Sequence, residues 1–133
     1  MKITLPWKLW KILKDTVKIK VINDYYSNVD YELTSKKTDK VMYLELKCRD
    51  IKYSNCKSFI IGKTKIDNIN SKSLTPCILI WKFGDLIYFK EYTTDLLKYK
   101  TTTIQNSKVI YIEKTDCQCG MDKLTELILT LLN

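Results

Sequence analysis

The chain has 133 residues, enough for one compact domain with one hydrophobic core, and 45% of them are hydrophobic. Lys and Arg total 23 against 15 acidic residues, and the resulting charge of +8 favours a polyanionic partner, nucleic acid first and an anionic membrane second. The complete absence of histidine excludes Ser-His-Asp triads, Cys-His nucleophiles and histidine metal sites, and the three glycines lie too far apart for a phosphate-binding glycine loop.

Residues 6–16 are predicted to form a short amphipathic helix. Pro6 suits the first turn of a helix, and Trp7, Trp10 and Leu13 follow at close to helical spacing. We expect this stripe, with its tryptophans, to pack in the core, and the lysines between them to face solvent.

Three strands are predicted next, because the spacing of apolar residues changes to two. They cover residues 17–22, about 28–34, and 41–48. The polar run 35–40 joins the second and third strands as a hairpin.

The second half of the chain is predicted to supply two helices and two or three further strands. The helices cover about 63–72 and 123–132, the latter with Asp122 as its N-cap, and the strands cover 77–81, 86–92 and 108–112. This order of elements predicts an α/β fold: one domain over residues 1–133, with a central mixed β-sheet flanked by helices.

The strand at 41–48 carries a charged face that points to chemistry. Residues two apart in a strand share a face, so Glu45, Lys47 and Arg49 project together, and the leucines between them project to the other side. A strand half exposed to solvent would show the same alternation.

The preceding strand makes a catalytic interpretation more specific. It carries Asp30 and Glu32, again two apart. If the hairpin is centred between residues 37 and 38, Asp30 faces Glu45 and Glu32 faces Tyr43.

Two carboxylates in directly paired positions repel each other unless a cation neutralises them. Asp30 and Glu45, together with waters and a substrate phosphate, would suit Mg²⁺. Lys47 would stand beside the cation, where an ammonium group can orient a water or stabilise charge on a phosphate.

Asp30 followed by Glu45-Leu46-Lys47 resembles the D…(D/E)xK signature of the PD-(D/E)xK nuclease superfamily, with Val29 in place of the proline. Residues 28–92 are similar to small endonuclease-like proteins of large DNA viruses and phages. The resemblance implies a restriction-endonuclease-like core and hydrolysis of DNA with Mg²⁺, or alternatively Mn²⁺, as cofactor.

The resemblance also implies roles for individual residues. Asp30, Glu45 and Lys47 would be catalytic, with Asp30 and Glu45 holding the metal and Lys47 assisting the attacking water. Glu32 is a further candidate metal ligand. The candidate substrate contacts are Arg49, Lys63 and Lys65, and the first helix's usual acidic residue has its only candidate in Asp15.

Two other functions are compatible with the sequence. The chain could be a catalytically inactive nuclease-like subunit that binds nucleic acid or assembles into a viral transcription, replication or virion complex. Alternatively, the leucine-rich face of the C-terminal helix could join a second copy or a viral protein partner.

We expect an intracellular protein with reduced thiols, located in a host cytoplasm or nucleus or packaged in a virion. The first 13 residues mix Trp with Lys and lack the apolar segment of a secretory signal, and the five cysteines are odd in number. No apolar run approaches the roughly 20 residues that span a bilayer, so no membrane insertion is expected.

Overall fold

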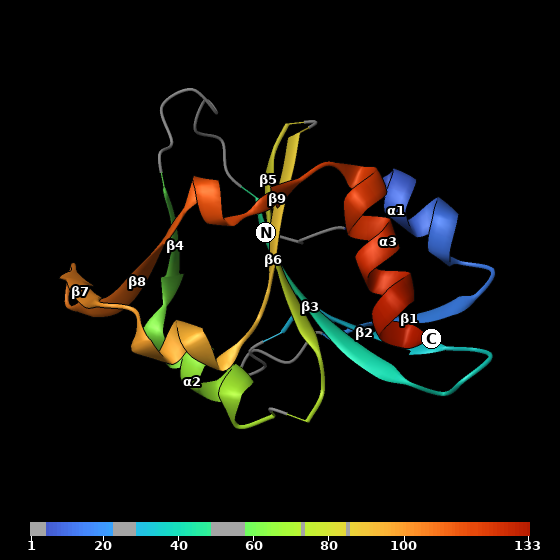
Figure 1. Cartoon of the computed structure of the whole chain (residues 1–133), viewed down its shortest axis with the longest axis horizontal. Helices are drawn as coiled ribbons and strands as arrows, with labels where there is room; N and C mark the ends of the chain where they lie inside the picture. Colours follow the sequence, from blue (N-terminus) through green and yellow to red (C-terminus); the bar gives the residue numbers. More distant parts are fainter. Residues whose placement is uncertain (1–4, 23–28, 49–57, 73, 85) are drawn as a thin grey trace.

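The computed structural model describes residues 5–22, 29–48, 58–72, 74–84 and 86–133. These residues form a mixed sheet with helices packed on it, which confirms the predicted α/β fold (Figure 1).

A six-stranded sheet with the strand order β1-β2-β3-β5-β6-β9 forms the centre of the molecule. Its strands are β1 (Val17–Val21), β2 (Tyr31–Ser35), β3 (Val41–Cys48), β5 (Cys77–Phe83), β6 (Leu86–Glu91) and β9 (Gln118–Cys119). β3 and β5 run parallel and the other neighbours run antiparallel. Because β5 lies inside the sheet and is covered on both faces, its residues are almost all buried, which explains its continuous apolar run.

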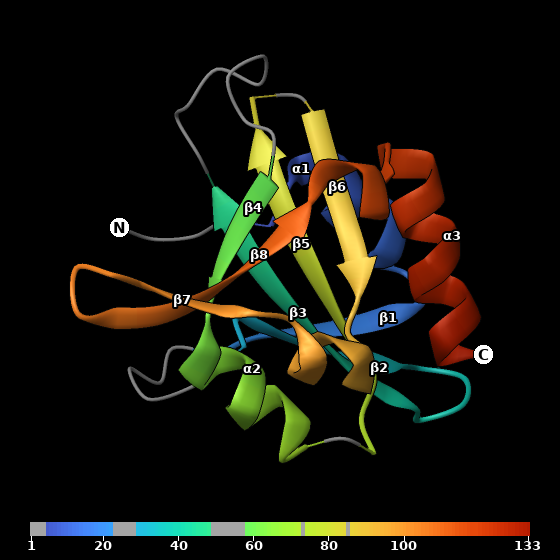
Figure 2. The ribbon, with the colours of Figure 1, turned by 60° about the vertical axis from the view of Figure 1, so that its left-hand side comes forward.

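Helices α1 (Trp7–Leu13) and α3 (Met121–Leu132) cover one face of this sheet and lie beside each other (Figures 1 and 2). Leu9, Leu13, Leu124 and Ile128 are fully buried there, against even-numbered side chains of β3 such as Leu44. This first core is the larger apolar layer of the molecule.

The tryptophans of α1 do not belong to that core, so the expected stripe was wrong. Trp7 is 66% exposed and Trp10 is 45% exposed, whereas Leu5, Leu9 and Leu13, spaced four apart, face the sheet. In a helix of only two turns the leucine stripe sets the orientation, and this turns both indole rings to the surface.

The C-terminal helix also differs from expectation. Gly120, with φ of 113°, occupies the N-cap position, and Asp122 lies in the first turn, where its charge still complements the helix dipole. The apolar face that suggested a partner is already packed within the chain, since Leu124, Ile128 and Leu132 are buried in the first core.

The other face of the central sheet carries a second layer, which contains a smaller sheet and a helix (Figure 2). Its elements are β4 (Ser58–Gly62), α2 (Lys63–Asn70), β7 (Thr101–Ile104), β8 (Ser107–Glu113) and the 3₁₀ turns η2 (Thr94–Lys98) and η3 (Lys114–Asp116). The small sheet has the order β4-β8-β7. Phe59 stacks on Trp81 across the layers at 5.0 Å, so Trp81 is a core residue as expected.

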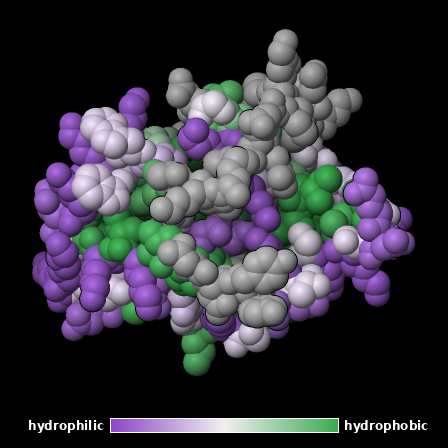
Figure 3. All heavy atoms as spheres, turned by 180° about the vertical axis from the view of Figure 1, so that it is seen from behind, coloured by the Kyte–Doolittle hydropathy of each residue, from purple (hydrophilic) through white to green (hydrophobic). Residues whose placement is uncertain are grey.

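On the face shown in Figure 3, hydrophilic residues gather at both lateral edges, with hydrophobic patches between them. None of the described helices is long and apolar enough to cross a membrane.

Candidate active site

The predicted pairing of β2 with β3 is confirmed. Tyr31 pairs with Leu44 and Glu32 with Tyr43. Asp30 lies one residue before β2, and its backbone N–H donates to the Leu44 carbonyl at 2.9 Å, which brings it beside Glu45.

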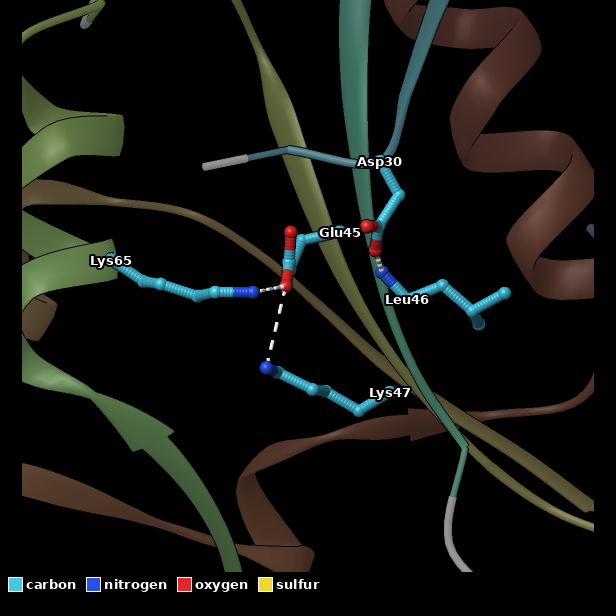
Figure 4. Close-up of polar contacts among 5 residues, drawn as sticks. All are labelled: Asp30, Glu45, Leu46, Lys47 and Lys65. Atoms are coloured by element: carbon cyan, nitrogen blue, oxygen red, sulfur yellow. Dashed lines mark hydrogen bonds and ion pairs between the residues drawn. The ribbon is translucent and has the colours of Figure 1, made fainter. Parts of the chain in front are cut away.

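The side chain of Asp30 also bonds to the backbone of β3. Its Oδ2 accepts a hydrogen bond from the backbone N–H of Leu46 at 2.7 Å, as Figure 4 shows. This bond fixes the carboxylate next to β3 and orients it beside that of Glu45.

Glu45 is the most unusual residue of the structure, a carboxylate with only 1% of its surface exposed. Odd-numbered β3 side chains point toward the second layer, which covers Glu45 where a one-sided sheet would leave it in water. Its Oε1 accepts a short hydrogen bond from Lys65 Nζ, which reaches across from α2, and lies 3.5 Å from Lys47 Nζ (Figure 4).

The second oxygen, Oε2, is buried and has no hydrogen-bond partner among the residues that the structure describes. An unpaired buried carboxylate oxygen is costly, and a cation would satisfy it. The part of the chain that is described contains no group of three acidic or thiol side chains around one point. Two carboxylates nevertheless fit Mg²⁺, which usually keeps several waters and binds one or two carboxylates together with substrate phosphates.

The surroundings of Glu45 perturb its proton affinity. Burial raises the pKa of the Glu45 carboxyl above its ordinary value of 4.5, and the charge of Asp30 adds to this rise, while Lys65 and Lys47 oppose it. Burial alone would lower the pKa of Lys65, but its bond to Glu45 outweighs this and the net shift is upward. The two lysines therefore do not fully offset burial and the charge of Asp30, which both favour the protonated form of Glu45.

The remaining predicted residues have different positions. Glu32 pairs with Tyr43 and Lys20 and does not complete a three-carboxylate group. Asp15 is exposed in the turn after α1, a helix on the opposite face of the central sheet, so it does not join the site. Arg49 lies outside the described residues.

Two lysines of α2 have separate partners. Lys63, predicted to contact substrate, forms an ion pair of 2.7 Å with Asp67 one turn later in the helix. Lys65, predicted in the same role, contacts Glu45 instead, an arrangement that strand patterns could not reveal because it depends on how α2 packs over β3.

An open groove of about 1010 Å³ adjoins these residues. Its lining includes Lys47, Lys63 and Lys65 on one side and Thr101, Thr103 and Lys108 of the β7–β8 hairpin on the other. Sequence reasoning missed the hairpin residues, although three consecutive threonines before Gln105-Asn106 are a signal for a strand and a turn.

Comparison with known proteins places this geometry in a nuclease fold. No family model and no curated protein matches the chain. Among solved structures, Hjc, a Holliday junction resolvase from the archaeal hyperthermophile Archaeoglobus fulgidus, is similar with a TM-score of 0.54 and 7% identity, covering 90% of this chain and 89% of its own. D212, a nuclease from a fusselovirus, has a TM-score of 0.60 and 13% identity, covering 93% of this chain and 83% of its own. The predicted resemblance to a nuclease is therefore confirmed at the level of the fold.

The burial of Glu45 predicts how Glu45→Gln changes stability in EDTA. Because the folded state raises the pKa of Glu45, this residue stabilises the fold most below its unfolded pKa of 4.5, and the contribution is lost as pH rises through the folded pKa. Glutamine cannot titrate, so the free energy of unfolding of the variant should rise relative to that of the wild type as the pH increases from about 4.5 toward neutrality. In the variant Lys65 loses its charged partner, but its side chain is one third exposed, so its ammonium can turn to water.

Urea unfolding across this pH range measures the effect, with the exposed Glu126→Gln on α3 as the matched control. A loss of about 3–5 kcal/mol at neutral pH, as for a broken buried ion pair, would show instead that Glu45 is a structural partner of the lysines.

Proposed function

We propose that the chain is a Mg²⁺-dependent endonuclease that hydrolyses phosphodiester bonds of DNA at the Asp30–Glu45 pair. The observation that carries the proposal is Glu45 itself, a buried carboxylate with one oxygen that has no partner among the described residues. A second carboxylate lies beside it and two lysines surround it. The nuclease fold of both similar structures supports a nuclease, and the basic groove next to the pair supports a nucleic-acid substrate.

Asp30 and Glu45 would hold the cation, Mg²⁺ or Mn²⁺. When bound, such a cation would stabilise charge on the phosphate and favour ionisation of the attacking water. In the hydrolysis, the oxygen of water forms a bond to phosphorus, one phosphorus–oxygen bond to a sugar breaks, and a proton ends on the leaving oxygen.

The two lysines would have different tasks. Lys47, on the same strand face as Glu45 and lining the groove, can orient the water and offset charge on the phosphate. Lys65 neutralises Glu45 in the metal-free protein and, once a cation replaces it there, can turn to the phosphates in the groove.

A viral origin, with a location in a host cytoplasm or nucleus or in a virion, belongs to the same proposal. It rests on the viral resemblance of the sequence and is in keeping with the fusselovirus nuclease among similar structures.

One observation favours a second function, a nuclease-like subunit that binds nucleic acid without cutting it. The Lys65 ammonium already bonds to Glu45, and the described residues supply no third carboxylate. In that case Lys65 would permanently replace the cation, and the groove would serve binding alone. Homodimers or viral protein partners would then matter more to function than the carboxylate pair.

Cleavage assays separate the two functions. The purified protein should nick or cut DNA with Mg²⁺ or Mn²⁺ and be inert in EDTA, because hydrolysis without histidine depends on a cation. Glu45→Gln should lower the cutting rate by at least about a thousandfold while Glu126→Gln, on the far side of the central sheet, cuts normally. If the wild type cut no DNA with either metal over duplex, branched and single-stranded substrates, the binding function would replace the proposal.

Competition between Lys65 and the cation gives a separate prediction. A unit charge at about 4 Å is worth about 4 kcal/mol at an effective dielectric constant of 20, so its removal favours a divalent cation strongly even after screening. Lys65→Met should therefore tighten Mn²⁺ binding by about tenfold or more, measured by titration calorimetry without DNA. Lys63→Met, whose ammonium is paired with Asp67, should change it much less. Unchanged or weaker Mn²⁺ binding in Lys65→Met would place the cation elsewhere.

A further inference from the structure

The β7–β8 hairpin forms a wall of the groove that the carboxylate site does not explain. The other wall comes from the beginning of α2, and Lys47 lies between them as part of the same lining. The groove therefore extends the candidate active site toward a hairpin that supplies neither of the two candidate metal-binding carboxylates.

The hairpin is anchored firmly at its base. Residues 109–113 of β8 pair with β4, and Ile110 and Ile112 are fully buried in the second core. A two-residue turn, Gln105-Asn106, with φ of 48° and 67°, reverses the chain as tight hairpins require. The groove wall is thus fixed by core packing.

The hairpin presents hydrogen-bond donors to the groove at regular spacing. Thr101 and Thr103 line it and Thr102 does not, as expected for alternate residues of a strand. Lys108 pairs with Thr103 across the hairpin, and Asn106 and Ser107 add an amide and a hydroxyl. This wall offers hydroxyl, amide and ammonium groups and no carboxylate among its described lining residues.

The charge and the functional groups of the groove indicate which kind of ligand it can bind. Four lysines and one aspartate belong to the described lining, and that aspartate, Asp67, is paired with Lys63. The same lining contains no aromatic side chain on which an unpaired base could stack. Such a surface suits phosphate and sugar oxygens, which position a duplex, and does not suit splayed bases.

We infer that the β7–β8 hairpin is a clamp for the backbone of duplex DNA: Lys108 and the hydroxyls of Thr101 and Thr103 hold phosphates on one side of the groove while α2 faces the other side. This inference rests on the proposed function, because it names duplex DNA as the substrate of the proposed nuclease site. The clamp would hold the duplex through its backbone, independently of sequence, with a scissile phosphate near Lys47 and Glu45.

Binding to a fluorescent duplex in EDTA, measured by anisotropy over a range of salt, tests the clamp without cutting. Lys108→Gln should reduce the salt slope by about 0.9 and weaken binding about eightfold at about 0.1 M salt, the change for one lost phosphate contact. Duplexes of different sequence should be affected equally. Lys123→Gln, an exposed lysine on α3 across the central sheet, is the matched control and should leave the slope unchanged.

A second pair of variants removes hydroxyls and keeps strand-forming side chains. Thr101→Val with Thr103→Val should weaken binding and leave the salt slope unchanged, because no charge is lost. Thr102→Val, exposed on the other side of β7, should bind as the wild type.

The outcomes separate the clamp from the nuclease proposal. If Lys108→Gln and the threonine pair weaken binding as described but the wild type never cuts, the clamp stands and the nuclease proposal fails. Duplex binding that is the same in Lys108→Gln, the threonine pair and the wild type would overturn the clamp, even with active cutting. Binding to single strands alone would overturn it as well.

Discussion

The structure depends on one costly arrangement, the burial of Glu45 between the two layers of the molecule. A carboxylate that loses its water must recover the lost interactions from its surroundings. Lys65 and Lys47 do this for Oε1, yet Oε2 has no partner among the described residues and the charge of Asp30 opposes ionisation. A fold optimised for stability alone would place an apolar side chain here, so a buried carboxylate at this position points to a functional role.

The topology of the chain creates this arrangement step by step. The antiparallel pairing of β2 with β3 brings Asp30 beside Glu45, and the bond from Leu46 N–H to Asp30 fixes it there. The parallel pairing of β3 with β5 requires a long connection. This connection contains β4 and α2, which pack over the sheet and place Lys65 next to Glu45. The small sheet then continues from β4 through β8 to β7, so the hairpin lies along the same groove. The candidate active site and the lysine-lined groove beside it thus follow from one crossover.

The strands and their pairing could be predicted from the spacing of apolar residues, whereas contacts between the layers could not. Alternation along 41–48 and a hairpin turn were enough to predict the β2–β3 register that brings Asp30 next to Glu45, because register fixes which side chains share a face. The tryptophans of α1 were misplaced because a helix of two turns offers two plausible stripes, and only contact with the sheet selects Leu9 and Leu13. The contact of Lys65 with Glu45 joins residues 20 apart on different layers, which no spacing rule can reveal.

The proposed cation site at Glu45 and Asp30 can be observed in a crystal structure of the protein with Mn²⁺. Anomalous scattering identifies the ion without reference to activity. We expect a Mn²⁺ peak about 2.0–2.3 Å from Glu45 Oε2 and from a carboxylate oxygen of Asp30, with the Lys65 ammonium moved away from Glu45. A structure that showed no peak at saturating Mn²⁺, with Lys65 still bonded to Glu45, would contradict it.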